Sequence, residues 1–220
     1  MMRTRVKICG LTRAADGIAA AEAGADALGF VCYERSPRHV APEALATLAR
    51  QLPPLATPVL LFVNAAPAAI ERALAVVPDA LLQFHGDETE ADCTRWGRPY
   101  LRAVRMDAGV DLLDCFARFR SARGLLADAP SAGFGGSGQR FDWGCLPRRR
   151  PGALVLAGGL DARCVGEAIA RVRPEAVDVS SGVESAPGLK DAGRIREFIA
   201  AVRAADDSLN REQHEPLRSA

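Results

Sequence analysis

Residues 176–184 read AVDVSSGVE: a short and mainly apolar run, AVDV, is followed by two serines and a glycine. The run does not alternate apolar and polar positions, which is typical of a strand buried on both faces in a parallel sheet. The small polar residues after it are suited to a turn at the carboxyl end of such a strand. The fold can be inferred from how often this pattern recurs.

The pattern occurs eight times, with amphipathic segments between the runs. The runs lie at 6–9, 27–32, 59–63, 80–85, 101–106, 124–128, 153–157 and 176–180. Helices are predicted at 13–23, 42–52, 67–76, 111–120, 161–173 and 190–203, where apolar residues recur three and four apart. Eight strand–helix units of about 27 residues each predict a single (β/α)8 TIM barrel of the α/β class, with its active site at the C-terminal face. A doubly wound sheet is the alternative, but no GxGxxG turn follows the first run.

One catalytic barrel domain is expected over residues 1–205. The segment 206–220, DDSLNREQHEPLRSA, is polar and aperiodic, so we expect a disordered C-terminal tail. The longest irregular stretch, 129–151, contains GFGGSGQRFDW, and a loop of this length inside a compact domain is typical of a functional segment.

Composition argues against several classes of partner. The 28 basic and 27 acidic residues give a net charge of +1, so no nucleic-acid binding is expected. The chain has no apolar stretch long enough to cross a membrane and no signal-peptide pattern, so we expect a cytoplasmic protein without membrane contact. Six scattered cysteines without a CxxC pair predict reduced thiols and no metal site.

Glycine-rich turns follow the seventh and eighth runs. Gly158 and Gly159 allow the backbone to approach an anion, and Ser180, Ser181 and Gly182 supply amides and hydroxyls. Phosphate sites of barrels use backbone N–H groups from these two loops. The alternative is that the glycines only form turns, but the pairing of the two loops favours phosphate binding.

Cys9, at the end of the first run, and Asp128, at the end of the sixth, are a candidate general base and general acid. A thiol with a pKa of about 8.5 needs a neighbouring cation to act as a base, and Lys7 is a candidate on the same side of the strand. The residues alone also fit structural roles. Cys9 could be a small buried residue beside Gly10, and Asp128 a helix cap or an arginine partner.

A resemblance to a known family rests on blocks that occur in one order between residues 7 and 191. They are KICGLT, GADALGFV, SPRHV, LLQFHGDE, GGSGQRFDW, LAGGL, VDVSSGVES and PGLKD. Together they resemble phosphoribosylanthranilate isomerase of tryptophan biosynthesis. KICG with FDW and SSGVE is specific, because related phosphate-binding barrels share the glycine turns without this set.

The resemblance implies an Amadori rearrangement of N-(5-phosphoribosyl)anthranilate, with a phosphosugar substrate and no cofactor or metal. It gives Cys9 the role of general base and Asp128, seven residues before Gly135, that of general acid. Arg38 of SPRH would receive the anthranilate carboxylate, because a guanidinium binds a carboxylate at two points. The phosphate falls to the loops with Gly158, Gly159, Ser180, Ser181 and Gly182. A working base implies a lowered pKa for Cys9, and family members are monomers or homodimers.

Three other functions, two catalytic and one of binding alone, are weaker alternatives. The aminoaldose isomerase of histidine synthesis typically pairs two aspartates, whereas the first run here ends in cysteine. Indole-glycerol-phosphate synthase requires a lysine acid, and the chain has only Lys7 and Lys190. A non-catalytic phosphometabolite-binding barrel would not need both Cys9 and Asp128. His85 and Asp87, in HGDE at the end of the fourth run, are left out of the catalytic set. Asp142, before Trp143, and Asp178, inside the eighth run, are interpreted as structural residues or as residues that support the site.

Overall fold

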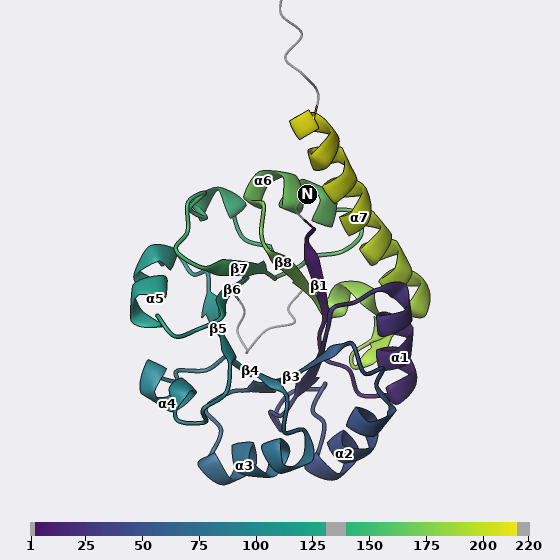
Figure 1. Cartoon of the computed structure of the whole chain (residues 1–220), viewed down its shortest axis with the longest axis vertical. Coiled ribbons are helices and arrows are strands. Elements are labelled where there is room, and N and C mark those ends of the chain that lie inside the picture. Colours follow the sequence, from purple (N-terminus) through teal and green to yellow (C-terminus); the bar gives the residue numbers. More distant parts are fainter. Residues whose placement is uncertain (1–2, 131–139, 215–220) are drawn as a thin grey trace, which may run out of the picture.

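The computed structural model describes residues 3–130 and 140–214, which form a closed barrel of eight parallel strands (Figure 1). β1 pairs with both β2 and β8, and this closes the sheet. All eight predicted strands and the predicted TIM barrel are therefore confirmed. The strands are β1 (Arg5–Ile8), β2 (Ala27–Val31), β3 (Thr57–Phe62), β4 (Leu81–Phe84), β5 (Tyr100–Arg105), β6 (Gly124–Asp128), β7 (Ala153–Leu156) and β8 (Ala176–Val179).

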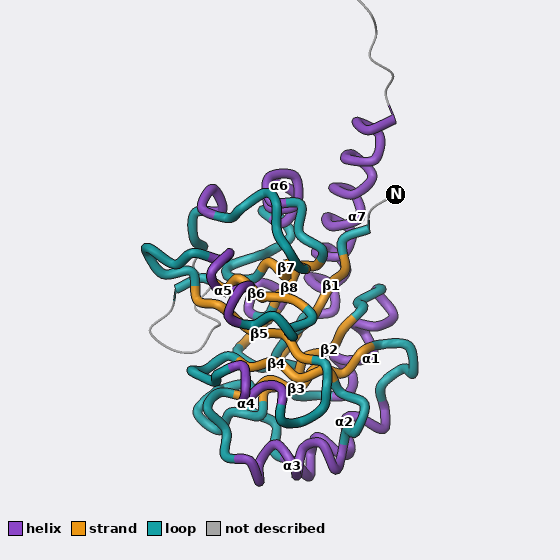
Figure 2. Tube along the Cα trace, turned by 60° about the vertical axis from the view of Figure 1, so that its left-hand side comes forward, coloured by secondary structure: helices purple, strands orange, loops and turns teal. Residues whose placement is uncertain are grey.

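Helices surround the strands in a ring (Figures 1 and 2). Proline in the first turn begins α2 and α3, where its fixed φ and missing N–H suit a helix start. The ring also contains α4, a five-residue helix that the sequence did not predict. None of the helices in the described part is long and apolar enough to cross a membrane. The helices are α1 (Ala14–Ala23), α2 (Pro42–Gln51), α3 (Pro67–Val76), α4 (Glu90–Thr94), α5 (Leu112–Arg118), α6 (Val165–Val172) and α7 (Ala192–His214).

Short elements lie where two of the strand–helix units differ from the regular pattern. Between β6 and β7, the described residues include only a 3₁₀ turn, η1 (Trp143–Cys145). After β8 come a second 3₁₀ turn, η2 (Ser181–Val183), and the hairpin of β9 (Glu184–Ala186) and β10 (Leu189–Lys190). This hairpin brings residues 184 and 190 together beside the end of β8.

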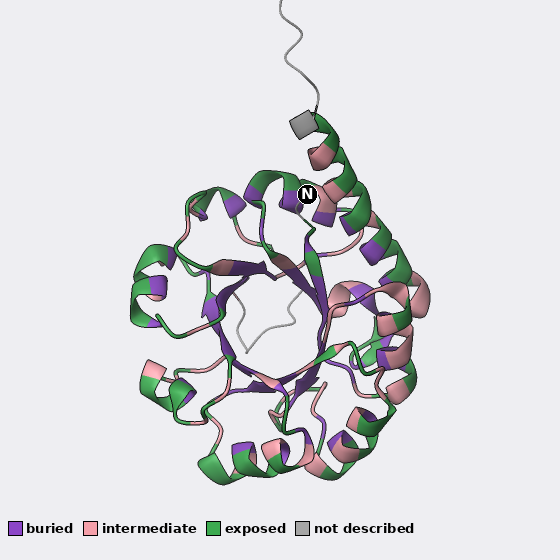
Figure 3. Cartoon of the chain, viewed as in Figure 1, coloured by how far each residue is buried: buried purple, intermediate pink, exposed green. Residues whose placement is uncertain are grey.

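The strands are buried on both faces, as the purple arrows of Figure 3 show. Their outward side chains pack against the helices in the main core, and the inward ones form two smaller clusters. Each strand has helices on one side and the barrel interior on the other, so neither face is exposed to solvent. The apolar runs in the sequence therefore do not alternate with polar residues. Four buried polar side chains of the strands interrupt the inward surface: Lys7, Gln83, Asp128 and Asp178.

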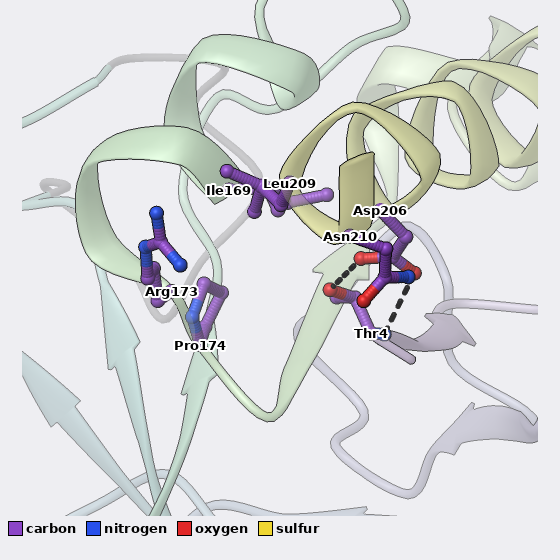
Figure 4. Close-up of a pocket in the computed structure, with 7 residues that line it drawn as sticks. All are labelled: Thr4, Ile169, Arg173, Pro174, Asp206, Leu209 and Asn210. Atoms are coloured by element: carbon purple, nitrogen blue, oxygen red, sulfur yellow. Dashed lines mark hydrogen bonds between the residues drawn. The ribbon is translucent and has the colours of Figure 1, made fainter. Parts of the chain in front are cut away.

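Helix α7 extends past the ring of helices and is longer than predicted (Figure 1). Residues 206–214 belong to it, so the expected disordered tail is wrong there, and residues 215–220 lie outside the described residues. The carboxylate of Asp206 accepts hydrogen bonds from the amide of Thr4 at 2.8 Å and from its hydroxyl at 2.7 Å. Figure 4 shows these bonds beside a small pocket between α6 and α7. The helix is thereby fastened to the start of β1.

Candidate active site

Cys9 follows β1 and faces the barrel interior, where it packs against Val31, Leu61 and Val63. A Cβ at Gly29 would lie 2.9 Å from its Sγ. The neighbouring strand therefore needs a glycine to accommodate the thiol, which is 5% exposed as a residue.

Lys7 lies below the thiol, and its Nζ donates a 2.9 Å hydrogen bond to Oδ1 of Asp178 across β1 and β8. Burial disfavours the charge of Lys7, but Asp178 and the nearby thiol outweigh burial and raise its pKa. Burial also raises the pKa of Cys9, and the attraction of Lys7 offsets this only in part. The prediction that the pKa of Cys9 is lowered is wrong for this structure, because loss of solvent outweighs the neighbouring cation.

Asp128 ends β6 and also faces inward, and its side chain is 12% exposed. Its Oδ1 accepts a hydrogen bond of 2.9 Å from the amide of Ala129, and its Oδ2 lies 3.2 Å from Nε2 of His85. The other ring nitrogen of His85 lies 3.4 Å from Nε2 of Gln83 on β4. His85, left out of the catalytic set on sequence grounds, is thus a direct neighbour of the candidate acid.

Arg38 crosses directly over Gly10, the glycine of KICG. Gly10 has a φ of +75°, and a Cβ there would lie 2.5 Å from Cδ of Arg38 and 3.0 Å from Oγ of Ser180. Both the backbone conformation and the close approach require glycine. This glycine brings the arginine and the start of the loop after β8 next to Cys9.

The guanidinium of Arg38 binds the carboxylate of Glu184, with Nε and one Nη at 2.8 and 2.7 Å from its two oxygens. Nζ of Lys190 donates to the same carboxylate at 2.7 Å and to the carbonyl of Ser180 at 3.1 Å. Burial alone would raise the pKa of Glu184, but Arg38 and Lys190 outweigh it and lower that pKa. Sequence reasoning named neither Glu184 nor Lys190 as part of the site, although both lie in the SSGVE and PGLKD blocks.

The glycine-rich turns pack against one another at the ends of β6, β7 and β8. A Cβ at Gly158 would lie 2.6 Å from Cβ of Ala129, and one at Gly182 would overlap the carbonyl oxygen of Leu160. Gly158 and Gly159 have φ values of +82° and +64°. The two loops assigned to phosphate therefore lie side by side, with close backbone contacts that side chains would prevent.

Several other expected residues have simpler roles. Asp87 exchanges hydrogen bonds with Asn64, and Asp142 accepts one from the amide of Gly144. Each side chain thus has a hydrogen-bond partner in a neighbouring turn. The Gly135–Gly138 segment lies outside the described residues. Within the described ranges, no group of three or more histidine, cysteine or acidic side chains could hold a metal ion.

The arrangement thus combines a thiol and a carboxyl group at different points of one barrel mouth, a cation beside the thiol, and two glycine-rich loops. It can exchange protons with a small substrate that is held through its anionic groups.

Comparison with known proteins identifies close relatives. Residues 6–201 match the family model described as N-(5'-phosphoribosyl)anthranilate isomerase. The N-(5'-phosphoribosyl)anthranilate isomerase of Methylibium petroleiphilum is 58% identical over 205 residues, which cover 93% of this chain and 96% of that protein.

Two solved structures have the same fold. The phosphoribosyl anthranilate isomerase of Thermotoga maritima is similar with a TM-score of 0.84 and 40% identity, over 91% of this chain and 99% of that one. A phosphoribosyl anthranilate isomerase in complex with reduced 1-(o-carboxyphenylamino)-1-deoxyribulose 5-phosphate has a TM-score of 0.81 and 36% identity, over 91% and 99% of the two chains.

Proposed function

The chain belongs to the N-(5'-phosphoribosyl)anthranilate isomerase family. From this membership we propose which of its residues act as acid, as base and in substrate binding. The enzyme converts N-(5'-phosphoribosyl)anthranilate into 1-(2-carboxyphenylamino)-1-deoxyribulose 5-phosphate, a step of tryptophan biosynthesis. The observation that carries the proposal is the presence of Cys9 and Asp128 on the inward face of one barrel mouth, beside two packed glycine-rich loops.

Asp128 is the general acid. As a carboxylic acid it gives its proton to the ring oxygen of the ribose, and the ring opens to a Schiff base. Its position at the end of β6, 12% exposed, allows contact with substrate while most of the group is shielded from water. Such an acid contributes roughly 10²–10⁴-fold to the rate.

Cys9 is the general base. As a thiolate it removes the proton from C2 of the opened sugar, which gives an enolamine that tautomerises to the ketone. Because burial raises the pKa of Cys9, the thiol is the main form at neutral pH, and the nearby ammonium of Lys7 supports the reactive thiolate. Each passage to the enolamine leaves Asp128 as a carboxylate and Cys9 as a thiol, so one proton must return before the next turnover.

Arg38 receives the anthranilate carboxylate. Glu184 uses two of the five N–H donors of the guanidinium, so a second carboxylate can approach along the other edge. The phosphate binds to the loops with Gly158, Gly159, Ser180, Ser181 and Gly182, whose close packing holds backbone amides in place. This separates the two anionic ends of the substrate onto different loops.

The residues assigned above to acid, base and anion binding all lie at one end of a single barrel. We infer further that the protein works as a monomer or a homodimer, and that it does so in the cytoplasm. Light scattering of the purified protein, with activity measured across the same concentration range, tests this.

The assignment is tested by Cys9→Ala and Asp128→Asn, with Cys145→Ala and Asp142→Asn as matched controls outside the site. We expect each site variant to lose at least about a hundredfold in turnover of phosphoribosylanthranilate, followed by its fluorescence, and the controls to keep theirs. Full activity of Cys9→Ala would remove the base assignment. Complementation of a tryptophan auxotroph lacking this isomerase provides the matching test in cells.

A further inference from the structure

Gln83 is an amide buried inside the barrel, with no exposed surface. Its nitrogen lies 3.4 Å from Nδ1 of His85, and its oxygen has no hydrogen-bond partner in the part of the chain that the structure describes. An unpaired buried carbonyl is unfavourable, so an apolar side chain would suit this position better if packing were its only role.

The amide continues a chain of polar groups to the candidate acid. With the Gln83 nitrogen donating to Nδ1 of His85, the ring carries its proton on Nε2 and donates it to Oδ2 of Asp128. Oδ1 of Asp128 already accepts from the amide of Ala129. In this arrangement both oxygens accept hydrogen bonds, which suits the carboxylate form of Asp128.

The reaction also requires Asp128 in its protonated, acid form. A half-turn of the Gln83 amide would bring its oxygen to Nδ1, so that Nδ1 carries the ring proton and donates it. Nε2 of His85 would then accept the O–H of the protonated Asp128. His85 stays neutral with one ring proton in both arrangements, and Asp128 alone differs, by the proton that goes to the sugar.

We propose that Gln83 and His85 are positioning residues that keep Asp128 hydrogen-bonded both as an acid and as a carboxylate, through coupled amide rotation and change of tautomer. The ring proton exchanges through solvent at the mouth of the site, where the His85 side chain is 10% exposed. The inference rests on the acid role proposed for Asp128.

The backbone around His85 is held firmly, so these changes are confined to side-chain groups. The buried guanidinium of Arg102 donates to the carbonyl of Phe84 at 2.8 Å and to that of Gly86 at 2.6 Å. Oε2 of Glu88 accepts from the amide of Gly86 at 2.8 Å. The carbonyl groups on both sides of His85 are thus fixed by one side chain.

Other ionisable groups share the inward surface around Asp128. Arg105 of β5 is in register with it, and Asp178, Lys7 and Cys9 lie toward β8 and β1. Their charges influence the pH profile of every variant alike, so the test compares variants of Gln83 and His85 within that common background.

The experiment measures kcat and KM against pH for Gln83→Met, with Leu101→Met as the control. Leu101 is the residue of β5 in register with Gln83, so its exchange for methionine reports packing changes in the same region of the barrel. We expect Gln83→Met to lower kcat about tenfold, a part of the roughly 10²–10⁴-fold that a general acid contributes. KM should stay nearly constant. Without the Gln83 amide, the ring of His85 settles as the Nε2–H tautomer, which favours the carboxylate form of Asp128 over the acid form. The alkaline limb of the kcat profile, where the acid form is lost, should therefore move to lower pH.

Rescue separates this role from a structural one. His85→Gln places at position 85 an amide that can itself donate or accept, so it should keep more activity than His85→Leu and should be insensitive to Gln83→Met. Equal effects of Gln83→Met and Leu101→Met, or an undiminished effect of Gln83→Met in the His85→Gln background, would overturn the inference. Full turnover in Asp128→Asn would instead overturn the acid role itself. The ring ¹⁵N chemical shifts of His85 report its tautomer directly, and they should differ between wild type and Gln83→Met.

Discussion

The carboxylate of Glu184 holds the guanidinium of Arg38 at two points, 2.8 and 2.7 Å, although 146 residues separate them in the chain. Lys190 binds the same carboxylate and also the backbone of Ser180. Glu184 therefore links the arginine proposed to receive the anthranilate carboxylate with the start of the loop proposed to bind phosphate. The two parts of the site that are proposed to bind anions therefore share one buried carboxylate.

Glu184→Gln should weaken substrate binding more than it slows chemistry. An amide keeps one acceptor oxygen and turns an N–H group toward a cation, so Arg38 loses its two-point partner. We expect KM to rise about tenfold, the equivalent of roughly 1.4 kcal/mol, with a smaller change in kcat. Glu167→Gln, which alters an exposed pair with Arg171, is the control and should match wild type. A lower kcat at constant KM would argue against the binding role.

The same pair should make stability depend on pH in acid. The pKa of Glu184 is lowered in the folded protein, so its stabilising effect is complete above the ordinary glutamate pKa of about 4.3 and is lost as pH falls through the lower folded value. Glu184→Gln should therefore reduce the free energy of unfolding by roughly 3–5 kcal/mol at neutral pH and by progressively less below about pH 4. Urea denaturation of both proteins across this range measures the difference. A difference that does not vary with pH would show that folding does not lower the pKa of Glu184.

The charges around Cys9 should shift its reactivity in opposite directions. Lys7 lowers the pKa of Cys9 and Asp178 raises it. Lys7→Gln should therefore reduce the thiolate fraction, and Asp178→Asn should increase it, by roughly tenfold for each pKa unit. Rates of iodoacetamide labelling against pH, resolved by peptide mass spectrometry, report this for Cys9, with the exposed Cys145 as an internal reference. Shifts in the same direction for both variants would contradict the assigned electrostatics.

Much of the architecture could be predicted because it depends on local patterns. A strand buried on both faces is necessarily apolar, so the eight runs stood out, and proline marked the starts of α2 and α3. Helix α4 was missed because five residues are too few for a periodic signal, although Thr89 and Asp92 form a capping box there. The end of α7 was missed because its last turns are polar and are fastened by a contact with Thr4.

The site was predicted less completely, since its interactions join distant strands. The position of Cys9 could be inferred from the end of an apolar run, but its pKa depends on burial, which no motif expresses. Gln83 inside LLQF and Asp178 inside AVDV carried a usable signal, because polar residues in the middle of buried strands are unfavourable without partners. The partners themselves, such as Lys7 for Asp178, became known only from the closed barrel.

Gly182→Ala should impair the phosphate site. A Cβ at this position would overlap the carbonyl oxygen of Leu160, so the loops after β7 and β8 must separate. We expect affinity for inorganic phosphate, measured by calorimetry, to fall at least about tenfold, or 1.4 kcal/mol. Gly166→Ala in α6 is the control, because a Cβ there meets nothing within 4 Å and alanine favours helix. Unchanged affinity in Gly182→Ala would separate these loops from phosphate binding.

The bond between α7 and the start of β1 should matter for stability and not for catalysis. Asp206 accepts two hydrogen bonds from Thr4, one from the amide and one from the hydroxyl, in a partly buried setting at the end of the barrel opposite the site (Figure 4). Asp206→Ala leaves both donors without this partner and should lower the free energy of unfolding by roughly 1–3 kcal/mol. The neighbouring Asp207 is exposed, so Asp207→Ala should change stability by less than about 0.5 kcal/mol. Urea denaturation measures both, and kcat and KM should match wild type in each. Equal stability of the two variants would mean that the hydrogen bonds between Thr4 and Asp206 do not stabilise the fold.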